Sequence, residues 1–184
     1  MKVLFNKINY FLLGVVIFLL CAGIILMSYS KSEIHLFINK YHSTFWDILL
    51  KHYTNIGDGL VPVILSLILL LLSVRAGIVM AVSTTLAGLL SQVFKRLIFP
   101  DMVRPKIFFQ HIADLYFVPG VEIHSYHSFP SGHTTTAFCM FLILAYFMPK
   151  KWLQVVFLLC AILVGYSRMY LSQHFLIDIY FATA

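Results

Sequence analysis

Residues 60–94 read LVPVILSLILLLLSVRAGIVMAVSTTLAGLLSQVF, and Arg75 is the one charged residue in this stretch. A single helix through all of it would be about 50 Å long, whereas the hydrocarbon core of a bilayer is about 30 Å thick. The stretch therefore predicts two membrane spans, residues 60–74 and 76–94, joined by a tight hairpin near residues 73–77. Small and hydroxylated residues in the second span favour close packing against neighbouring helices.

The composition of the whole chain agrees with a membrane protein. Of the 184 residues, 61% are hydrophobic and 11% are charged. A typical soluble domain is about half apolar and about a quarter charged. These values exclude a disordered chain, a nucleic-acid-binding domain with a solvated surface and most soluble enzymes. We expect a single domain over residues 1–184 with an all-α fold, a polytopic transmembrane helical bundle.

Further apolar runs extend this bundle at both ends. Residues 1–27 hold a first span that serves as a retained anchor, and residues 131–148 and 152–166 hold two more. A last apolar run follows His174 and reaches residue 184, which corresponds to about 16 Å of helix and is too short to cross a bilayer. We therefore expect a six-span core in which this chain stops partway through the sixth span.

Residues 28–58, between the first span and the helical core at residues 60–184, are polar and aromatic. Large apolar and aromatic side chains recur there at roughly helical spacing: Phe37, Tyr41, Phe45, Trp46 and Leu49. Trp and Tyr are enriched where a membrane meets water. The pattern predicts an amphipathic helix that lies at the interface.

The charged residues favour one orientation in the membrane. If the N-terminus is cytoplasmic, the inner segments carry five of the 13 Lys and Arg residues and none of the seven acids. The inner cations are Lys2, Lys7, Arg75, Lys150 and Lys151. A plain count of Lys and Arg does not select this orientation, because the other eight lie outside. Several of those eight belong to the polar clusters described next, so we expect this orientation.

The first polar cluster is FPSGH at residues 129–133, where Pro and Gly interrupt the chain just before an apolar run. A helix N-terminus offers unpaired N–H groups and the positive end of the helix dipole, which together suit an anion such as phosphate. Ser131 adds a hydroxyl donor, and His133 lies in the first turn. An ordinary helix cap is the alternative interpretation, because Ser is a favoured N-cap residue.

The second cluster begins at Ser167 and Arg168 and continues with His174 and Asp178. Residues four apart share one face of a helix, so the carboxylate of Asp178 can meet the imidazole of His174. A carboxylate on one ring nitrogen fixes the tautomer and makes the other nitrogen a better nucleophile. Arg168 offers a bidentate fork for phosphate oxygens. A buried ion pair that joins two helices is the structural alternative.

The third cluster is the basic pair Lys95 and Arg96, followed by Arg104 and Pro105. By themselves, such cations at the end of a span commonly contact lipid headgroups. The three clusters fall at the ends of the third, fourth, fifth and sixth spans, on the same side of the membrane. Two histidines, a carboxylate and several cations gathered there predict a phosphoryl-transfer site that needs no metal.

With these clusters the sequence resembles the type 2 phosphatidic acid phosphatase (PAP2) family, whose signatures are Lys-x6-Arg-Pro, Pro-Ser-Gly-His and Ser-Arg-x5-His-x3-Asp. The second signature matches residues 130–133 and the third matches residues 167–178 without deviation. The first departs, because Lys95 precedes Arg104 by eight intervening residues and Arg96 by seven, instead of six. The choice between these two cations therefore stays open.

The resemblance implies a mechanism and a set of roles. His174 would attack phosphorus and form a phosphohistidine, with Asp178 orienting its ring, while His133 would protonate the leaving oxygen and then activate water. The oxygens of the phosphate would be held by Lys95, Arg104, Ser131, Gly132 and Arg168. Members of the family work without a metal or organic cofactor.

The expected function is a metal-independent membrane phosphatase acting on a lipid phosphate or pyrophosphate. The candidate substrates are phosphatidic acid, phosphatidylglycerol phosphate, undecaprenyl pyrophosphate and lipid A phosphate, and the expected location is a bacterial cytoplasmic membrane with the site on its outer side. The expected partners are the lipid substrate and the bilayer, with no nucleic acid. A lipid-linked phosphotransferase that uses the same residues and a non-enzymatic transporter are the alternatives.

Overall fold

All regular elements in the part of the chain that the structure describes are helical, as the sequence predicts. The computed structural model describes residues 2–184, with side chains from residue 8 onward. The α-helices are α1 (Lys2–Ser28), α2 (Lys31–Asn39), α3 (Thr44–Tyr53), α4 (Leu60–Leu72), α5 (Val74–Val93), α6 (Pro105–Phe108), α7 (Gly132–Phe147), α8 (Lys151–Tyr170) and α9 (Leu176–Thr183). A 3-10 turn, η1 (Thr54–Gly57), follows α3, and a π-helical turn, η2 (Phe94–Ile98), follows α5.

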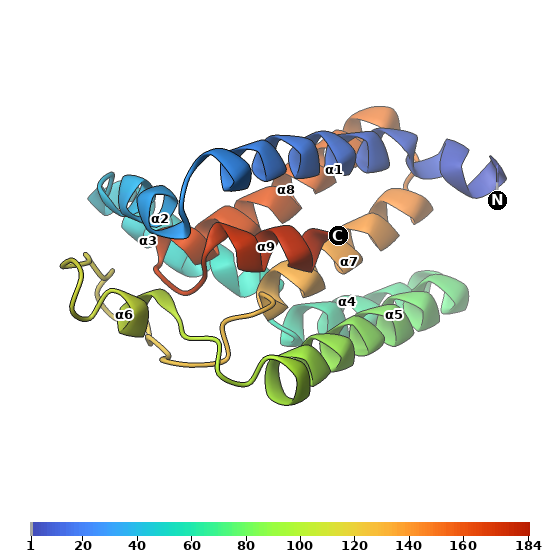
Figure 1. Cartoon of the computed structure of the whole chain (residues 1–184). Coiled ribbons are helices and arrows are strands. Elements are labelled where there is room, and N and C mark those ends of the chain that lie inside the picture. The colour runs from blue at the N-terminus through green and yellow to red at the C-terminus, as the bar shows by residue number, and fades with distance from the viewer. Residues whose placement is uncertain (1) are drawn as a thin grey trace.

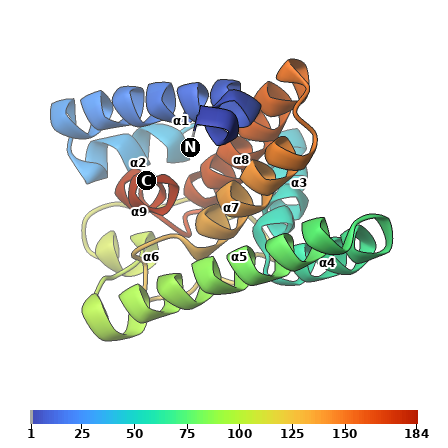
Figure 2. The same ribbon diagram turned by 90° about the vertical axis from the view of Figure 1, so that its right-hand side faces the viewer.

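Helices α7 and α8 form the centre of the bundle. Helix α1 packs along α8 and α7 on one side, the α4–α5 hairpin packs against α7 on the other, and α9 lies between α1 and α7 (Figures 1 and 2). Small side chains at the centre, among them Ala137, Ala145 and Ala161, are fully buried. Small residues let helices approach closely, which is how helices in a membrane gain packing energy.

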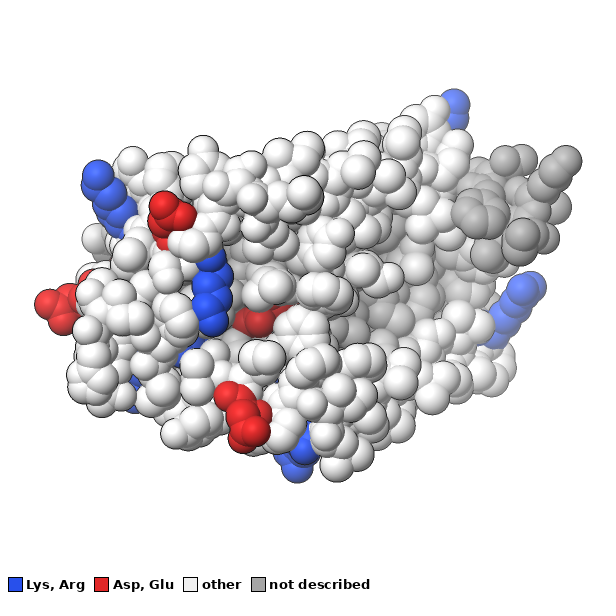
Figure 3. Space-filling model, viewed as in Figure 1, with Lys and Arg blue, Asp and Glu red and all other residues white. Residues whose placement is uncertain are grey.

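Within the described residues, three helical segments are long and apolar enough to cross a membrane: Ile8–Ser28, Val74–Ile98 and Lys151–Tyr170. The bent pair Thr44–Gly57 and Leu60–Leu72 meets the same test as one broken span. Many large apolar side chains on these helices face outward, as lipid-facing residues do. On the face in Figure 3, acidic residues lie only toward the end that carries the loops, and a broad uncharged zone separates them from the opposite end.

The hairpin predicted near residues 73–77 is present between α4 and α5. Ser73 is extended (φ −161°, ψ 109°), and its Oγ accepts a hydrogen bond from the N–H of Ala76. A Cβ atom on Gly77 would lie 2.7 Å from the backbone nitrogen of Leu70, so the two helices meet here at a separation that only glycine permits. The predicted hairpin is confirmed, but Leu60–Leu72 meets the test for a membrane span only together with Thr44–Gly57.

Residues 28–58 differ from the single amphipathic helix that the sequence predicts. They form two helices, α2 and α3, followed by η1, and the α3–η1 segment continues into α4 with a bend of 58°. The aromatic side chains Phe37, Phe45 and Trp46 are exposed, whereas the polar residues His35, Asn39 and Asp47 are buried. The one-helix prediction was wrong because the break at residues 40–43 carries no Pro or Gly. A position at the membrane interface stays a prediction.

Candidate active site

The polar clusters named from the sequence meet at the end of the bundle that carries the long loop (Figure 1). Lys95 lies in η2, Arg104 just before α6, and Arg168 in the last turn of α8. Ser131, Gly132 and His133 form the start of α7, His174 lies in the loop after α8, and Asp178 lies in α9. All eight are brought to one end of the bundle, and their roles in a reaction stay predictions.

His174 and Asp178 form a buried pair. Nδ1 of His174 lies 3.2 Å from Oδ2 of Asp178, and both residues are nearly inaccessible to solvent. Their geometry differs from the expected one, because His174 precedes α9 instead of sharing its face. Asp178 is in the first turn, and its Oδ2 also accepts the N–H of Phe175 at 3.0 Å. The carboxylate thus caps the helix and holds Nδ1, which leaves Nε2 as the free ring nitrogen.

Ser128 is a member of this cluster that the sequence analysis missed. Its hydroxyl donates a hydrogen bond to Oδ2 of Asp178 and lies 3.5 Å from Nδ1 of His174. Ser128 is 1% exposed, so water does not compete for this contact. Its place two residues before Pro130, in the segment that leads into α7, is a signal that could have identified it.

Two arginines are held by neighbours that no sequence pattern indicated. Nη1 of Arg104 donates to Oε1 of Gln173 at 2.8 Å, and its Nε donates to the carbonyl oxygen of Tyr126 at 2.9 Å. Nη1 of Arg168 donates to Oγ1 of Thr54 at 2.9 Å. Nε of Arg168 is buried and has no partner among the described residues. An unpaired buried guanidinium donor is costly, and an anionic ligand would satisfy it.

Lys95, and not Arg96, lies beside the start of α7. A Cβ atom on Gly132 would be 3.7 Å from Nζ of Lys95, and Lys95 is 8% exposed. Arg96 is exposed, and its Nε donates to Oε1 of Gln92 at 3.1 Å. The wider π-helical turn takes up part of the additional chain between Lys95 and Arg104. Of the two cations that the irregular first signature left open, Lys95 is therefore the one beside Gly132, and its role in binding stays a prediction.

The start of α7 is tightly enclosed. Ser131 is the N-cap residue, but its side chain does not cap the helix and instead accepts a hydrogen bond from Oγ1 of Thr134 at 2.9 Å. The N–H of Ser131 donates to the carbonyl oxygen of Asp178 at 3.1 Å, which ties α7 to α9. On the other side, Gly57 packs so closely on His133 that a Cβ atom there would lie 2.6 Å from the His133 carbonyl oxygen.

The surroundings of His174 favour its neutral form. Burial is the main cause that holds the pKa of His174 well below its ordinary value, and the nearby charges of Arg104, Arg168, Lys95 and His133 lower it further. A neutral imidazole keeps its lone pair, and the nucleophile in a phosphoryl transfer needs that lone pair. The same cations would stabilise the charge of a bound phosphate.

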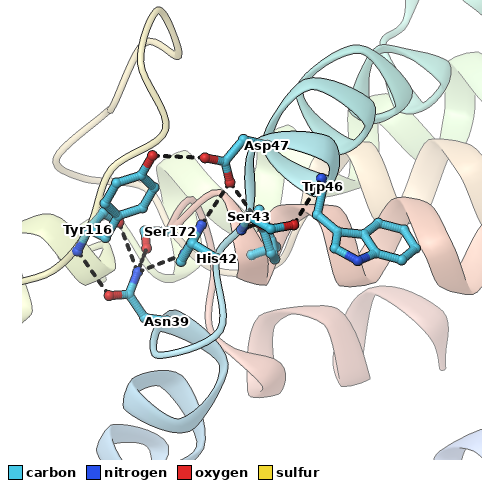
Figure 4. A network of polar contacts seen from close by, with 8 residues as sticks. Asn39, His42, Ser43, Trp46, Asp47, Tyr116 and Ser172 are labelled. Atoms are coloured by element: carbon cyan, nitrogen blue, oxygen red, sulfur yellow. Dashed lines mark hydrogen bonds and ion pairs between the residues drawn. The ribbon is translucent and has the colours of Figure 1, made fainter.

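A second polar network holds the loop that carries Arg104 and Ser128 (Figure 4). The amide of Asn39 donates to the carbonyl oxygen of Tyr116 at 2.8 Å and accepts from its N–H at 2.9 Å. The same amide donates to Oγ of Ser172 at 3.2 Å.

Asp47 of α3 accepts hydrogen bonds from the hydroxyls of Tyr116 and Tyr170. Helices α2 and α3 therefore fix both the loop and the turn that precedes His174.

A cleft of about 380 Å³ opens beside the cations of the site. Lys95, Arg96, Arg104, His124 and His127 are among its lining residues. Neither His124 nor His127 belongs to one of the three sequence signatures. His127 nevertheless lies close to the site, with its Nδ1 3.2 Å from the carbonyl oxygen of Lys95. The cleft has a cationic wall, and its lining residue Lys95 also lies beside Gly132, so the cleft suits the approach of an anionic group.

Residues 76–184 match the sequence profile of the PAP2 superfamily, which is more than half of the chain. This chain belongs to the PAP2 superfamily. The resemblance drawn from residues 130–133 and 167–178 is therefore confirmed.

Relatives of this PAP2 protein include lipid A 4'-phosphatase of Bacteroides thetaiotaomicron, 27% identical over 157 residues that cover 81% of this chain and 68% of that protein. Phosphatidylglycerophosphatase B of Bacillus subtilis is 39% identical over 72 residues, 34% of this chain and 35% of that protein.

Solved structures give the same fold. The crystal structure of Aquifex aeolicus LpxE matches with a TM-score of 0.71 at 24% identity, over 82% of this chain and 86% of that one. The transmembrane PAP2-type phosphatidylglycerolphosphate phosphatase of Bacillus subtilis matches with a TM-score of 0.69 at 25% identity, over 97% of this chain and 89% of that one. This PAP2 protein thus has the helical membrane fold that its sequence predicts.

Proposed function

We propose that this PAP2 protein is a membrane phosphatase that hydrolyses a lipid phosphate or pyrophosphate through a phosphohistidine intermediate. The observation that carries the proposal is the buried His174–Asp178 pair, which lies with three cations around the N-terminus of α7. The relatives named above are phosphatases of lipid A and of phosphatidylglycerophosphate, which supports a lipid substrate.

In the first step, Nε2 of His174 attacks phosphorus, an N–P bond forms, and the P–O bond to the lipid breaks. His133 gives its proton to the leaving oxygen, so the lipid departs as an alcohol, or as a monophosphate when the substrate is a pyrophosphate. Asp178 keeps the His174 ring in the tautomer with a free Nε2.

In the second step, His133 takes a proton from water, and the resulting hydroxide attacks phosphorus and breaks the N–P bond. Inorganic phosphate leaves, and both histidines return to their starting protonation states. Lys95, Arg104 and Arg168, with the Ser131 hydroxyl and the Gly132 N–H, hold the phosphoryl oxygens in both steps. We assign no step to a metal, so activity should persist in EDTA.

We also propose that the site faces the outer side of a bacterial cytoplasmic membrane. The segments that carry it end at the edge of the apolar zone, so a phosphate on an embedded lipid can reach the cations from the bilayer. The proposal leaves the choice among the four candidate lipids to experiment.

The decisive test measures phosphate release by the purified protein from those four lipids, with and without EDTA. We expect His174→Ala and His133→Ala to abolish release, while His52→Ala, at an exposed position of α3, keeps it. Release that survives in His174→Ala would overturn the mechanism, and release that requires an added alcohol acceptor would indicate a phosphotransferase.

A further inference from the structure

Ser91 is a buried hydroxyl without a partner among the described residues. It lies in α5 at 4% exposure, and its Oγ makes no hydrogen bond. Two other buried hydroxyls of the α4–α5 hairpin bond to their own helix, since Ser66 donates to the carbonyl of Pro62 at 2.6 Å and Thr84 to that of Met80 at 2.7 Å. Ser91 makes no such bond, although a helix always offers it. Its hydroxyl is therefore available to a ligand.

The free hydroxyl points at the start of α7. A Cβ atom on Gly132 would lie 3.6 Å from Oγ of Ser91 and 3.7 Å from Nζ of Lys95. Ser91 and Lys95 are four residues apart, so they share the buried face of one helix. The space next to Gly132 is thus bordered by a hydroxyl, an ammonium group and the unpaired N–H groups of a 16-residue helix.

We propose that the hydroxyl of Ser91 donates a hydrogen bond to a phosphoryl oxygen of the substrate, as a further binding residue of this site. The inference rests on the proposed phosphatase function. A buried donor needs an acceptor, and the other groups that border this space are themselves donors, so an anion with several oxygens satisfies all of them. No signature of the sequence includes this position, which lies one helical turn before Lys95.

The test compares Ser91→Ala with Ser66→Ala. Ser66 is the matched control, since it is also a serine at 4% exposure, but its hydroxyl is bonded within its own helix. We measure inhibition by orthovanadate and kcat/KM for dioctanoyl phosphatidic acid in detergent. Ser91→Ala should weaken vanadate binding about tenfold or more and lower kcat/KM by at least as much, since hydrogen bonds to charged groups are strong. Ser66→Ala should change both less than threefold.

Ser91→Cys, which keeps the size of the side chain but donates poorly, serves if the alanine variant does not fold. Its vanadate affinity should fall as in Ser91→Ala, with an unchanged melting temperature. Vanadate affinity of a folded Ser91 variant within threefold of wild type would overturn the inference. That result differs from failure of the proposed function, which would appear as a wild-type protein that releases no phosphate from any lipid.

Discussion

Ser128 contacts both members of the His174–Asp178 pair and can therefore be tested as a support of the nucleophile. Ser128→Ala removes a hydrogen bond to a buried carboxylate, and such bonds contribute about 1.5–3 kcal/mol. We expect kcat to fall at least tenfold in assays of phosphate release, with little change in KM. Ser83→Ala, on a half-buried part of α5, is the control. A wild-type kcat in Ser128→Ala would show that Asp178 needs no help from this hydroxyl.

Lys95 and Arg96 are adjacent cations with different surroundings, which makes them a matched pair. Lys95→Ala should lower kcat/KM about a hundredfold or more, because a buried charge beside a bound phosphate is weakly screened. Arg96→Ala should change it less than threefold, because the Arg96 side chain is exposed and bonds to Gln92. The reverse pattern in phosphate-release assays would mean that Arg96 turns into the site when substrate binds.

At the level of single residues, the sequence named groups that the structure brings together at one end of the bundle, but not the neighbours that hold them. His133, His174 and Asp178 stand out because ionisable residues are rare beside membrane spans. Ser128, Thr54 and Gln173 are polar residues of ordinary type, and only the folded chain shows their contacts. The irregular spacing before Arg104 could not be resolved from sequence, because a π-helical turn has no clear residue pattern.

Among the helical elements, the close approach of η1 to α7 positions His133. Gly57→Ala would place a Cβ atom 2.6 Å from the backbone oxygen of His133, which cannot move without shifting α7. We expect a loss of about 1–3 kcal/mol of stability from overpacking and a large loss of activity. Gly59→Ala is the control, because a Cβ atom there meets nothing within 4 Å. Equal melting temperatures and activities for the two variants would contradict this role of Gly57.

Helix α2 packs against the rest of the molecule through His35, a buried titratable residue. Burial lowers the pKa of His35 to about 4, and its ring stacks on Phe109 while Nε2 lies 3.2 Å from Oγ of Ser172. The folded pKa is below the unfolded one, so the unfolded chain binds more protons as pH falls from 6.5 toward 4. The stability that depends on neutral His35 is fully present above pH 6.5. At pH 5 the free energy of unfolding should be lower by about 2 kcal/mol.

Thermal unfolding in detergent at pH 7 and pH 5 measures this effect. His35→Gln should lose less stability than wild type between the two pH values, whereas His52→Gln, at an exposed position, should behave as wild type. An equal loss in wild type and His35→Gln would show that His35 does not carry the acid sensitivity.

The helices that the sequence predicted well are those with long apolar runs, such as α5 and α8. The segment of α2 and α3 was misjudged because three of its polar residues are buried while its large aromatic residues are exposed. His35, Asn39 and Asp47 are buried, whereas Phe37 and Phe45 are exposed. In a membrane protein, aromatic side chains that face outward cost little free energy. The usual inference that the apolar face of a helix turns toward the core therefore fails here.

For the molecule as a whole, composition and apolar runs sufficed to predict an all-α membrane fold, and three short motifs sufficed to predict the family. The α4 helix shows what they could not predict. Its 13 residues form about 20 Å of helix, which is shorter than the hydrocarbon core. Only the structure shows that α3 and η1 continue it across a bend.

The orientation of the whole molecule can be tested by labelling. In a background without native cysteines, His124→Cys lies at the site end and Lys150→Cys lies between α7 and α8 at the other. We expect a membrane-impermeant maleimide added to intact bacterial spheroplasts to label the first and not the second. Labelling of Lys150→Cys alone would place the site on the cytoplasmic side and overturn the proposed location.

The π-helical turn at Phe94–Ile98 bears on how similar chains are recognised. Lys95 lies next to Gly132 although eight residues, instead of six, separate it from Arg104 and Pro105. A motif search that demands six intervening residues would therefore reject this protein. Patterns that let the gap vary by two residues and require the two later motifs would retain it. When a sequence fails the search because of the position of this lysine, the structure of the helix that carries the lysine should be examined before the sequence is excluded from the family.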